Sequence, residues 1–561
     1  MHGAAGEDSV PITRHIVKMA ILLNVVLWAI AVVLIVYEVG LIQAYPAGGD
    51  ESQQGDRRMQ YVAAVVEYPA LGDPTKEDPQ LVIGANCERY IRFMRQARDQ
   101  SADIIVFPEC GLTSMNLPPT REQLRKVLTP IPEPQNNPCD DDSAAQVLRN
   151  LSCATREARM YTVINIAEIE ECANRTGCPD DGALFYNTDV AFDRNGTIVA
   201  KYRKYNLFVE PGFNVTEMPE AVTFDTDWGG RVGLLTCQDF LYQEPARTLV
   251  EDLHVTDIAY PVAWFNELPF LVATSVQAGW SAARRVSVLA SGLHRPRAGN
   301  AGSGVYQAGG RPLVAALPTA DNVGAGQLLI APVPITRAPP LETRPTAAPP
   351  APLPVRASHI HVKTSEAGDL LLYQDYLAPY HAVELLPGAK HAVRICHAGD
   401  ASVGAATFCC DVDAEIDLST PPPSSLLPYR YMAGIFSGVR NFGGVKTAGI
   451  KVCGIMACGG ETDAGGEMCG LWNTSLSAAT ATLHRAIVAA NLTASTTFHL
   501  PISLTGELLP VAADKLRYNA DWHGASVQIE SPVTDLLVLA LWARDTTLDG
   551  DQPLGASATA A

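Results

Sequence analysis

Short apolar runs alternate with helical patterns over the first half of the chain. The runs predicted to be buried strands are YVAAVVE at 61–67, DIIVFPE at 103–109, YTVINI at 161–166, RVGLLT at 231–236, and the segments 189–193 and 257–262. Apolar residues recur at helical spacing from Ile83 to Ala97, and 269–291 is a second helical stretch. Strands that alternate with helices predict an α/β layered core.

The pattern changes after about residue 310. Residues 332–357 are rich in proline and alanine, so we expect a semi-rigid linker or an exposed insertion there. Short β-like runs and a cluster of cysteines follow, which predicts a smaller β-rich, disulfide-bonded domain over 358–545. The small and polar residues 546–561 are expected to form a flexible tail.

The N-terminus carries a membrane signal. Residues 19–37 contain no charged side chain, and Arg14 and Lys18 precede them. At about 1.5 Å per residue, a helix of this length nearly crosses the hydrocarbon layer. We therefore expect 19–41 to be an uncleaved signal anchor behind a cytoplasmic segment 1–18, or a long signal peptide cut near Ala44. A buried soluble helix is disfavoured because the run has no polar face.

Two further features favour export. Sequons, the acceptor sequences for N-glycosylation, occur at Asn150, Asn174, Asn195, Asn214, Asn473 and Asn491. The chain also has 13 cysteines, most of which should pair in an oxidising compartment, and an odd number leaves at least one thiol over. We expect an extracellular protein that is a type II membrane protein, or is secreted if the N-terminal segment is cleaved.

Length and charge narrow the classes of function. A chain of 561 residues, 47% of them hydrophobic, is long enough for two folded units. The formal charge of −19 disfavours nucleic acid as a partner, because phosphate binding needs a basic surface.

Reactive side chains follow three of the predicted strands. Glu109 closes DIIVFPE, Lys204 follows GTIVAKYR, and Cys237 follows RVGLLT. Strand ends in an α/β sheet face the crevice where ligands bind. A carboxylate can take a thiol proton, a thiolate can attack a carbonyl, and an ammonium can stabilise the oxyanion. The separations along the chain do not show that these groups meet, so a core or disulfide-bonded cysteine and surface charges stay open. A Cys–His pair with His254 or His294 is disfavoured, and His294 is expected to stabilise its own loop.

Several sequence blocks in one order carry a resemblance to a known family. These blocks are FPECGLTS, KYRKYNLF, GLLTCQDF, YPVAWFNELP at 260–269, GSGVY at 302–306, the CC pair at 409–410 and the CGIMAC cluster that ends at Cys469. From about residue 60 to 545, the chain resembles the vanin and biotinidase branch of the nitrilase superfamily, insect vanin-like proteins in particular. The resemblance implies a nitrilase-type four-layer α-β-β-α sandwich over 58–331, followed by the β-rich domain, and hydrolysis of a linear amide.

The resemblance also implies roles for individual residues. Cys237 would be the nucleophile, Glu109 the proton acceptor, and Lys204 the proton donor and oxyanion partner, together with the backbone N–H of Gln238. Glu210 is a candidate supporting carboxylate, although its loop differs from the family pattern. Trp264 is expected in the substrate pocket, and Trp280 in the core. No cofactor or metal is expected.

The cysteines outside the site are expected to form disulfides. We predict Cys139–Cys153 and Cys172–Cys178, which would close short loops, and three more bridges of open connectivity among Cys396, Cys409, Cys410, Cys453, Cys458 and Cys469. A zinc site in this C-terminal cluster is disfavoured by the exported setting. Cys87 and Cys110 either pair with each other or stay free.

Three functional readings stay open. Vanins cleave pantetheine to pantothenate and cysteamine, biotinidases release biotin from biocytin, and a catalytically silent relative would serve binding or adhesion. The sequence does not rank the acyl groups or indicate an oligomeric state.

Overall fold

The computed structural model describes residues 59–173, 175–208, 210–319, 324, 326–339, 363–397, 407–418, 430–442, 446–461, 467–469, 481–492, 497–521 and 523–548. They belong to one compact unit, residues 58–561. The segment 19–41, predicted to be an anchor or signal peptide, lies outside the described residues, as do the tail from residue 549 and most of the predicted linker. Within the described residues, no helix has both the length and the apolar composition needed to cross a membrane.

The first sheet has seven strands. In spatial order they are β14 (Gln327–Pro334), β1 (Gln60–Glu67), β2 (Ile104–Val106), β4 (Tyr161–Glu171), β5 (Ala183–Phe192) and β6 (Ile198–Arg203), with β3 (Thr129–Pro130) beside β4. Strands β1, β2 and β4 are parallel, and the outer strands are antiparallel to their neighbours. β14 runs to Pro334, so the catalytic sheet includes the first residues of the proline-rich segment.

The second sheet has six strands. In spatial order they are β13 (Arg311–Ala316), β12 (Ser303–Gln307), β11 (Ser287–Gly292), β9 (Asp257–Val262), β8 (Arg231–Leu234) and β7 (Thr223–Asp225). Strands β8, β9 and β11 are parallel to one another. Alternate residues of β1 bury their side chains on opposite faces: Val65 packs in the core between the two sheets with Leu234 of the second sheet, whereas Val66 packs beneath the helices.

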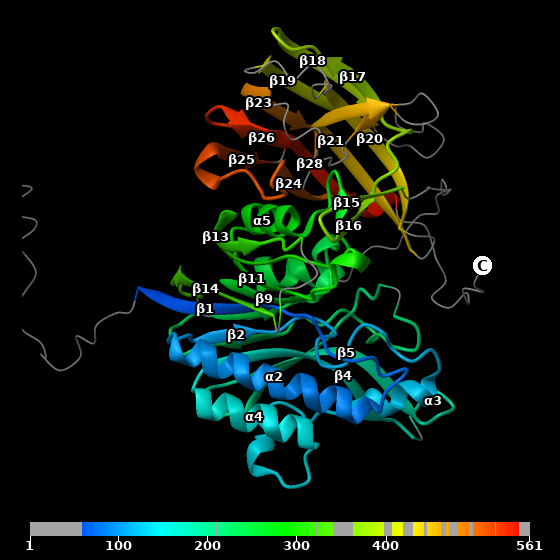
Figure 1. Ribbon diagram of the computed structural model, residues 1–561, viewed down its shortest axis with the longest axis vertical. Helices are drawn as coiled ribbons and strands as arrows, with labels where there is room; N and C mark the ends of the chain where they lie inside the picture. Colours follow the sequence, from blue (N-terminus) through cyan, green and yellow to red (C-terminus); the bar gives the residue numbers. More distant parts are fainter. Residues whose placement is uncertain are drawn as a thin grey trace, which may run out of the picture. The chain divides into compact units, whose positions relative to one another are not determined.

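Helices cover the outer faces of both sheets. α2 (Pro79–Asp99) and α4 (Gln146–Ala158) lie together on the first sheet, and α5 (Ala273–Arg284) packs outside the second (Figure 1). The side chain of Asp78 caps α2 by accepting a hydrogen bond from the Gln80 amide at 2.9 Å. The layers are therefore α-β-β-α, as predicted.

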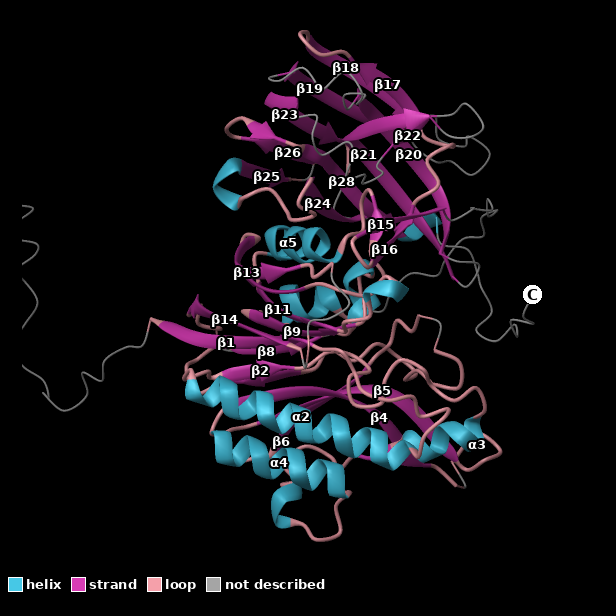
Figure 2. Cartoon of the chain, in the orientation of Figure 1, coloured by secondary structure: helices cyan, strands magenta, loops and turns pink. Residues whose placement is uncertain are grey.

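The C-terminal region is built almost entirely of antiparallel strands (Figure 2). One sheet contains β17 (His381–Leu385), β20 (Arg430–Phe442), β21 (Lys446–Glu461), β28 (Leu536–Asp545) and β24 (Thr497–Thr505), with β22 (Glu467–Cys469) beside β21. The other contains β18 (Lys390–His397), β19 (Phe408–Leu418), β23 (Ala481–Ala490), β26 (Ala525–Ile529) and β25 (Leu516–Ala520), with β27 (Val533–Thr534) beside β23. The two sheets bury a shared apolar core, so the predicted β-rich domain is present.

Strands of the two regions are also joined directly. β10 (Glu267–Leu268) pairs with β16 (Leu370–Gln374), which pairs with β15 (Lys363–Ala367). The hydroxyl of Ser275 in α5 donates to the carbonyl oxygen of Ser503 at 2.8 Å. The Arg544 Nε donates to the carbonyl oxygen of Leu241 at 3.0 Å. The C-terminal region therefore contacts the segment that follows the predicted nucleophile.

One predicted helix was partly wrong. The stretch 269–291 was expected to be helical throughout, but α5 ends at Arg284 and residues 287–292 form strand β11. Arg285 has a φ of 57°, a left-handed conformation that ends the helix. The run VSVLASG is apolar on both faces because β11 is buried on both sides of its sheet, and such a run has no alternation to distinguish it from a helix.

The disulfides agree with the predictions that the described residues allow to be compared. Cys139–Cys153 and Cys172–Cys178 are both present. The C-terminal cluster contains Cys396–Cys409 and Cys410–Cys453, and Cys458 is also disulfide-bonded, with Cys469 opposite it in the strand register. Cys87, Cys110 and Cys237 are free thiols.

Candidate active site

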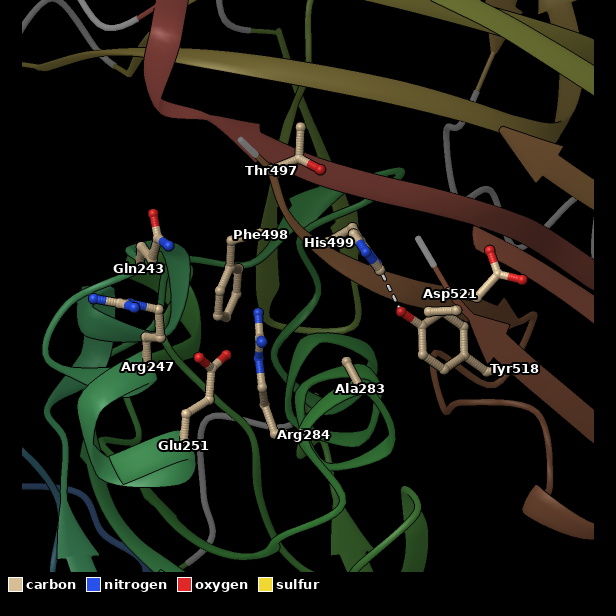
Figure 3. Close-up of a pocket in the computed structure, with 11 residues that line it drawn as sticks. Gln243, Arg247, Glu251, Ala283, Arg284, Thr497, Phe498, His499, Tyr518 and Asp521 are labelled. Atoms are coloured by element: carbon tan, nitrogen blue, oxygen red, sulfur yellow. Dashed lines mark hydrogen bonds between the residues drawn. The ribbon is translucent and has the colours of Figure 1, made fainter. Parts of the chain in front are cut away.

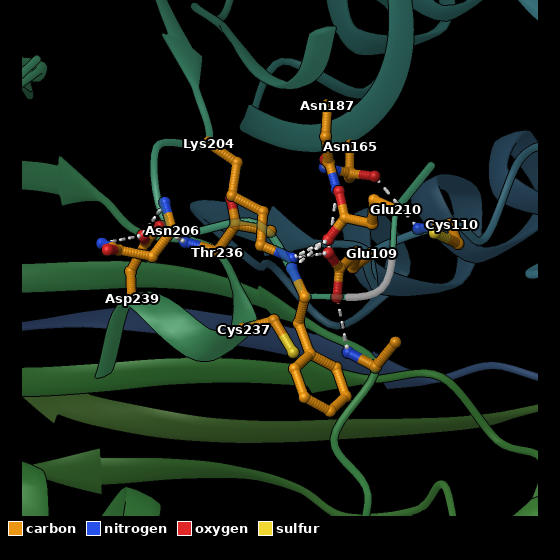
Figure 4. A network of polar contacts seen from close by, with 12 residues as sticks. Glu109, Cys110, Asn165, Asn187, Lys204, Asn206, Glu210, Thr236, Cys237 and Asp239 are labelled. Carbon is orange, nitrogen blue, oxygen red and sulfur yellow. Dashed lines mark hydrogen bonds and ion pairs between the residues drawn. The ribbon is translucent and has the colours of Figure 1, made fainter. Parts of the chain in front are cut away.

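Three side chains from separate strand ends converge between the two sheets. Glu109 lies just beyond β2, Lys204 directly follows β6, and Cys237 lies just beyond β8 of the second sheet. All three are buried, and Lys204 Nζ lies 2.7 Å from Glu109 Oε1. Figure 4 shows the Cys237 thiol beside this ion pair. The structure thus brings together the three residues that spacing alone could not connect.

A second carboxylate holds the same ammonium. Glu210 forms an ion pair with Lys204, so the Lys204 side chain lies between two carboxylates. The Asn187 side-chain amide donates to Glu109 Oε1 and to Glu210 Oε2, each at 2.9 Å. Burial acts to lower the pKa of Lys204, but the charges of Glu109 and Glu210 outweigh it and raise that pKa well above its ordinary value. Lys204 is therefore a fixed cation.

The remaining oxygen of Glu109 is held by the main chain. Glu109 Oε2 accepts a hydrogen bond from the Ala263 amide at 3.1 Å, immediately after β9. Burial, and then the negative charge of Glu109, raise the pKa of the Cys237 thiol well above its ordinary value, while Lys204 opposes them. The resting nucleophile is consequently a thiol, and its activation requires a nearby base.

The backbone at Cys237 has an uncommon conformation that other residues hold in place. Its φ is 47°, in the left-handed region. Thr236 begins the short 3₁₀ helix Cys237–Leu241 through a capping box with Asp239, whose carboxylate accepts from the Thr236 amide at 2.9 Å. The Tyr260 hydroxyl donates to the Cys237 carbonyl oxygen. The turn that carries the thiol is therefore fixed from both sides.

An apolar pocket of about 60 Å³ opens at the thiol. It is lined by Phe208, Cys237, Gln238, Leu241, Trp264, Phe265, Glu267 and Leu271. The indole N–H of Trp264 donates to the Leu271 carbonyl oxygen at 2.8 Å, which fixes the ring that was predicted to form the pocket wall. The side-chain oxygen of Gln238 is buried without a hydrogen-bond partner among the described residues. The pocket therefore offers an unpaired acceptor next to the thiol, besides the Gln238 amide that was predicted to bind the oxyanion.

Several residues of this network were not singled out in the sequence. Asn165 donates to the side chains of Asn187 at 2.6 Å and Asp189 at 2.8 Å, and its oxygen accepts from the Cys110 amide. Asn187 and Asp189 are buried in β5. Polar residues inside an otherwise apolar buried strand were the available signal, because such groups need partners in the interior.

Neither histidine considered as a partner of the cysteine lines the thiol pocket, and His254 is exposed. His294 is buried, with Nδ1 3.0 Å from Glu67 Oε1, and its amide donates to the Tyr68 carbonyl oxygen at 2.9 Å. It joins the end of β11 to the end of β1, which is the loop-stabilising position expected of it. Trp280 is fully buried and stacks on Phe240, as expected of a core residue.

The predicted glycosylation sites differ in exposure. Asn150, Asn195 and Asn491 are exposed, whereas Asn214 is half-buried. The Asn214 side-chain oxygen accepts from the Phe185 amide at 2.9 Å. Asn174 and Asn473 lie outside the described residues.

Comparison with known proteins gives two family matches. Residues 62–303 match the carbon-nitrogen hydrolase family, and residues 370–549 match the vanin C-terminal domain. Vanin-like protein 3 of Drosophila melanogaster is 33% identical over 422 residues, which cover 73% of each chain. Pantetheinase of Bos taurus is 40% identical over 259 residues, 44% of this chain and 50% of the relative. Biotinidase of Homo sapiens is 35% identical over 272 residues, 46% of this chain and 50% of the relative. The last two matches thus span about half the length of each relative.

Proposed function

The chain belongs to the vanin and biotinidase branch of the carbon-nitrogen hydrolase family, and we propose that it hydrolyses a linear amide through a thioester on Cys237. The observation that carries this proposal is a free, buried thiol beside the Glu109–Lys204 ion pair, at the mouth of an apolar pocket. Buried charges are costly unless they are paired or take part in chemistry. A cysteine with only a structural role would not require the two carboxylates and the ammonium that lie near Cys237.

The first half of the reaction forms the thioester. Glu109 accepts the thiol proton, and the thiolate attacks the amide carbon. The Lys204 ammonium and the Gln238 amide stabilise the oxyanion, each such contribution typically being worth about 10²–10³ in rate. Protonated Glu109 then gives its proton to the leaving nitrogen as the carbon–nitrogen bond breaks, which releases the amine.

The second half regenerates the enzyme. Glu109 takes a proton from water, the resulting hydroxide attacks the thioester carbon, and the carboxylic acid leaves as Cys237 recovers its proton. Glu210 keeps Lys204 charged and in place through its ion pair, so its role is positioning. Every step uses side chains of this chain, and none requires a cofactor.

Pantetheine is the substrate that we propose first. The supporting observation is that 259 residues of the chain match bovine pantetheinase at 40% identity, whereas 272 residues match human biotinidase at 35%. On this proposal the products are pantothenate and cysteamine. Biocytin is the second candidate, and its products would be biotin and lysine.

The location that we propose is extracellular, with the N-terminal segment 19–41 as a type II membrane anchor and the exposed sequons as glycan sites. The four disulfides with both partners described fit an oxidising compartment. Secretion of a cleaved form is the alternative.

Incubation of the purified full chain with pantetheine and with biocytin, in separate reactions, tests the function. We expect release of cysteamine from pantetheine, and no release from the Cys237→Ala variant. Release of biotin alone would transfer the proposal to biocytin. Release of neither product, from a chain whose Cys237 still reacts with iodoacetamide, would contradict both substrates.

A further inference from the structure

A second cavity lies apart from the thiol pocket. It has a volume of about 210 Å³ and shares no lining residue with the pocket at Cys237. Three parts of the chain line it: the segment after the nucleophile turn, the end of α5, and the C-terminal strands β24 and β25 (Figure 3). At about 30 Å³ per water molecule, its volume corresponds to about seven waters. The cavity is therefore large enough for a small organic molecule.

Arg284 is the less exposed of the two arginines that line this cavity. Its guanidinium carbon lies 3.8 Å from the centre of the Phe498 ring, and its Nε is buried without a hydrogen-bond partner. It forms no ion pair with any residue that the structure describes. Burial lowers its pKa to about 10, with Tyr518 and Glu251 opposing, so the side chain is still charged at neutral pH.

Two other arginines of low exposure, within the described part of the chain, have carboxylate partners. Arg231 pairs with Asp225 at 2.7 Å, and Arg203 pairs with Glu168 at 2.6 Å. Burying a guanidinium nitrogen without a carboxylate or carbonyl partner is unfavourable, and the ring face of Phe498 compensates only part of that cost. The Nε of Arg284 therefore lacks an acceptor.

The remaining polar groups of the cavity supply donors at depth and acids only at the mouth. Burial lowers the pKa of His499 to about 4, so its ring is neutral at pH 7. The Tyr518 hydroxyl lies 2.6 Å from His499 Nδ1, and burial raises the pKa of that phenol, so both groups are neutral at pH 7 and can donate a hydrogen bond. Glu251 and Asp521 are exposed, and the exposed Arg247 already pairs with Glu244 at 2.8 Å.

We propose that this cavity binds a small anion, a carboxylate or phosphate group, with Arg284 as its principal contact. An arginine fork matches the paired oxygens of either group, and Arg284 lines the cavity without an ion pair to any described residue. Because the lining comes from both the catalytic and the C-terminal regions, the bound anion stabilises their contact. This site is separate from the hydrolytic reaction and does not depend on which amide the enzyme cleaves.

Thermal unfolding of the full chain, titrated with inorganic phosphate and with acetate at constant ionic strength against chloride, tests the site. A ligand that binds only the folded state stabilises it by RT times the logarithm of one plus the ratio of ligand concentration to Kd, so Tm rises once the concentration approaches Kd and keeps rising logarithmically. We expect such a rise in Tm, beyond the chloride control, with at least one of the two anions. The anion that begins to raise Tm at the lower concentration identifies phosphate or carboxylate as the preferred group.

Variants assign any binding to the cavity. Arg284→Gln should weaken the apparent affinity at least about tenfold, the usual effect of losing one charged hydrogen-bonding partner. Arg311→Gln is the matched control, because Arg311 is exposed and its replacement removes the same charge outside the cavity. If Arg284→Gln does not fold, His499→Phe provides the same comparison. Equal stabilisation of wild type and cavity variants, or no rise in Tm beyond the chloride control with either anion, would overturn the proposal.

Discussion

Cys237 combines a reactive group with a backbone conformation that a side chain disfavours. Left-handed φ values at residues other than glycine cost on the order of 1–3 kcal/mol and persist where surrounding contacts enforce them. Here the Tyr260 hydroxyl and the Thr236–Asp239 capping box provide those contacts. These contacts orient the thiol toward the Glu109–Lys204 pair, so the strained turn serves the proposed nucleophile.

Replacement of the thiol should separate activity from folding. We expect Cys237→Ala to lower amide hydrolysis by at least about 10⁴-fold, because nucleophile removal abolishes the covalent route. Its circular dichroism and Tm should stay close to those of the wild type, since the lost sulfur borders a pocket. Iodoacetamide should label Cys237 before the other free thiols, because Cys237 lines that pocket beside the base Glu109, whereas Cys87 is packed in the core. Substantial residual hydrolysis in the variant would refute the nucleophile assignment.

Asp189 should make stability depend on pH. It is fully buried and accepts from the Thr236 hydroxyl at 2.7 Å, and burial raises its pKa to about 8. In the unfolded chain the pKa of this carboxyl is about 3.9, so unfolding releases a proton between about pH 4 and 8. The contribution of Asp189 to the free energy of unfolding is fully present below the pKa of the unfolded state. It is lost as the pH rises through the pKa of the folded state, by at most about 1.4 kcal/mol per pH unit.

Urea unfolding of Asp189→Asn and wild type at a series of pH values measures this contribution. The variant should lose less stability than the wild type as the pH rises to about 8. Asp257→Asn is the matched control, because burial raises the pKa of Asp257 only to about 6 and its effect should end at lower pH. Parallel stability curves for wild type and Asp189→Asn would show that Asp189 is already ionised in the folded protein.

At the scale of elements, the thiol pocket depends on a strand of the C-terminal region. Glu267 of β10 lines the pocket and forms an ion pair with Arg440 of β20. Arg440 Nε also lies 3.3 Å from Asp375 Oδ1, and the Asp375 amide donates to the Leu268 carbonyl oxygen at 2.8 Å. This cluster supports the segment that forms one wall of the thiol pocket.

Arg440→Met should therefore impair catalysis from a distance. Loss of the cation leaves the buried Asp375 and the partly buried Glu267 without their partner, at a cost of about 3–5 kcal/mol in the free energy of unfolding. We expect kcat/KM to fall at least about tenfold, mainly through KM, while iodoacetamide still labels Cys237. Arg394→Met is the control, since its pair with Asp411 is exposed and should contribute no more than about 1 kcal/mol. Unchanged KM in Arg440→Met would refute the coupling.

Apolar runs predicted strands β1, β2, β4, β5, β8 and β9, because a run of buried residues is visible within a short stretch of sequence. β1, β4 and β9 match runs whose apolar residues fill one or both faces of a sheet. The division of 269–291 into α5 and β11 was missed because a run buried on both faces lacks the alternation that identifies a strand. Family resemblance indicated Glu109, Lys204 and Cys237, but Asn187 and the Arg440 cluster depend on pairings between residues far apart in sequence, which no local pattern contains.

At the scale of the whole molecule, both the catalytic and the C-terminal regions contain disulfides, which fits the proposed export. Two close short loops in the catalytic region, and two hold strands of the C-terminal sheets. The remaining free thiols include the proposed nucleophile, so an oxidising compartment leaves the active site intact. The export that we propose would require a leader, and the apolar run near the N-terminus is the candidate.

The flanking charges of that run predict its orientation. Arg14 and Lys18 precede residues 19–37, whereas Glu38 and Asp50 follow them, so the positive-inside rule leaves a short cytoplasmic segment and exports the rest. The run is longer than an ordinary secretory signal of about 7–15 apolar residues, which favours retention as an anchor over cleavage. We expect the glycoprotein to stay with membranes after alkaline carbonate extraction and to keep residues 1–18 in mass spectrometry of its N-terminal peptide. Glycosidase treatment should reduce its mass in the same preparation. A chain that begins near Tyr45 in all the material would refute the anchor, while the glycans would still demonstrate export.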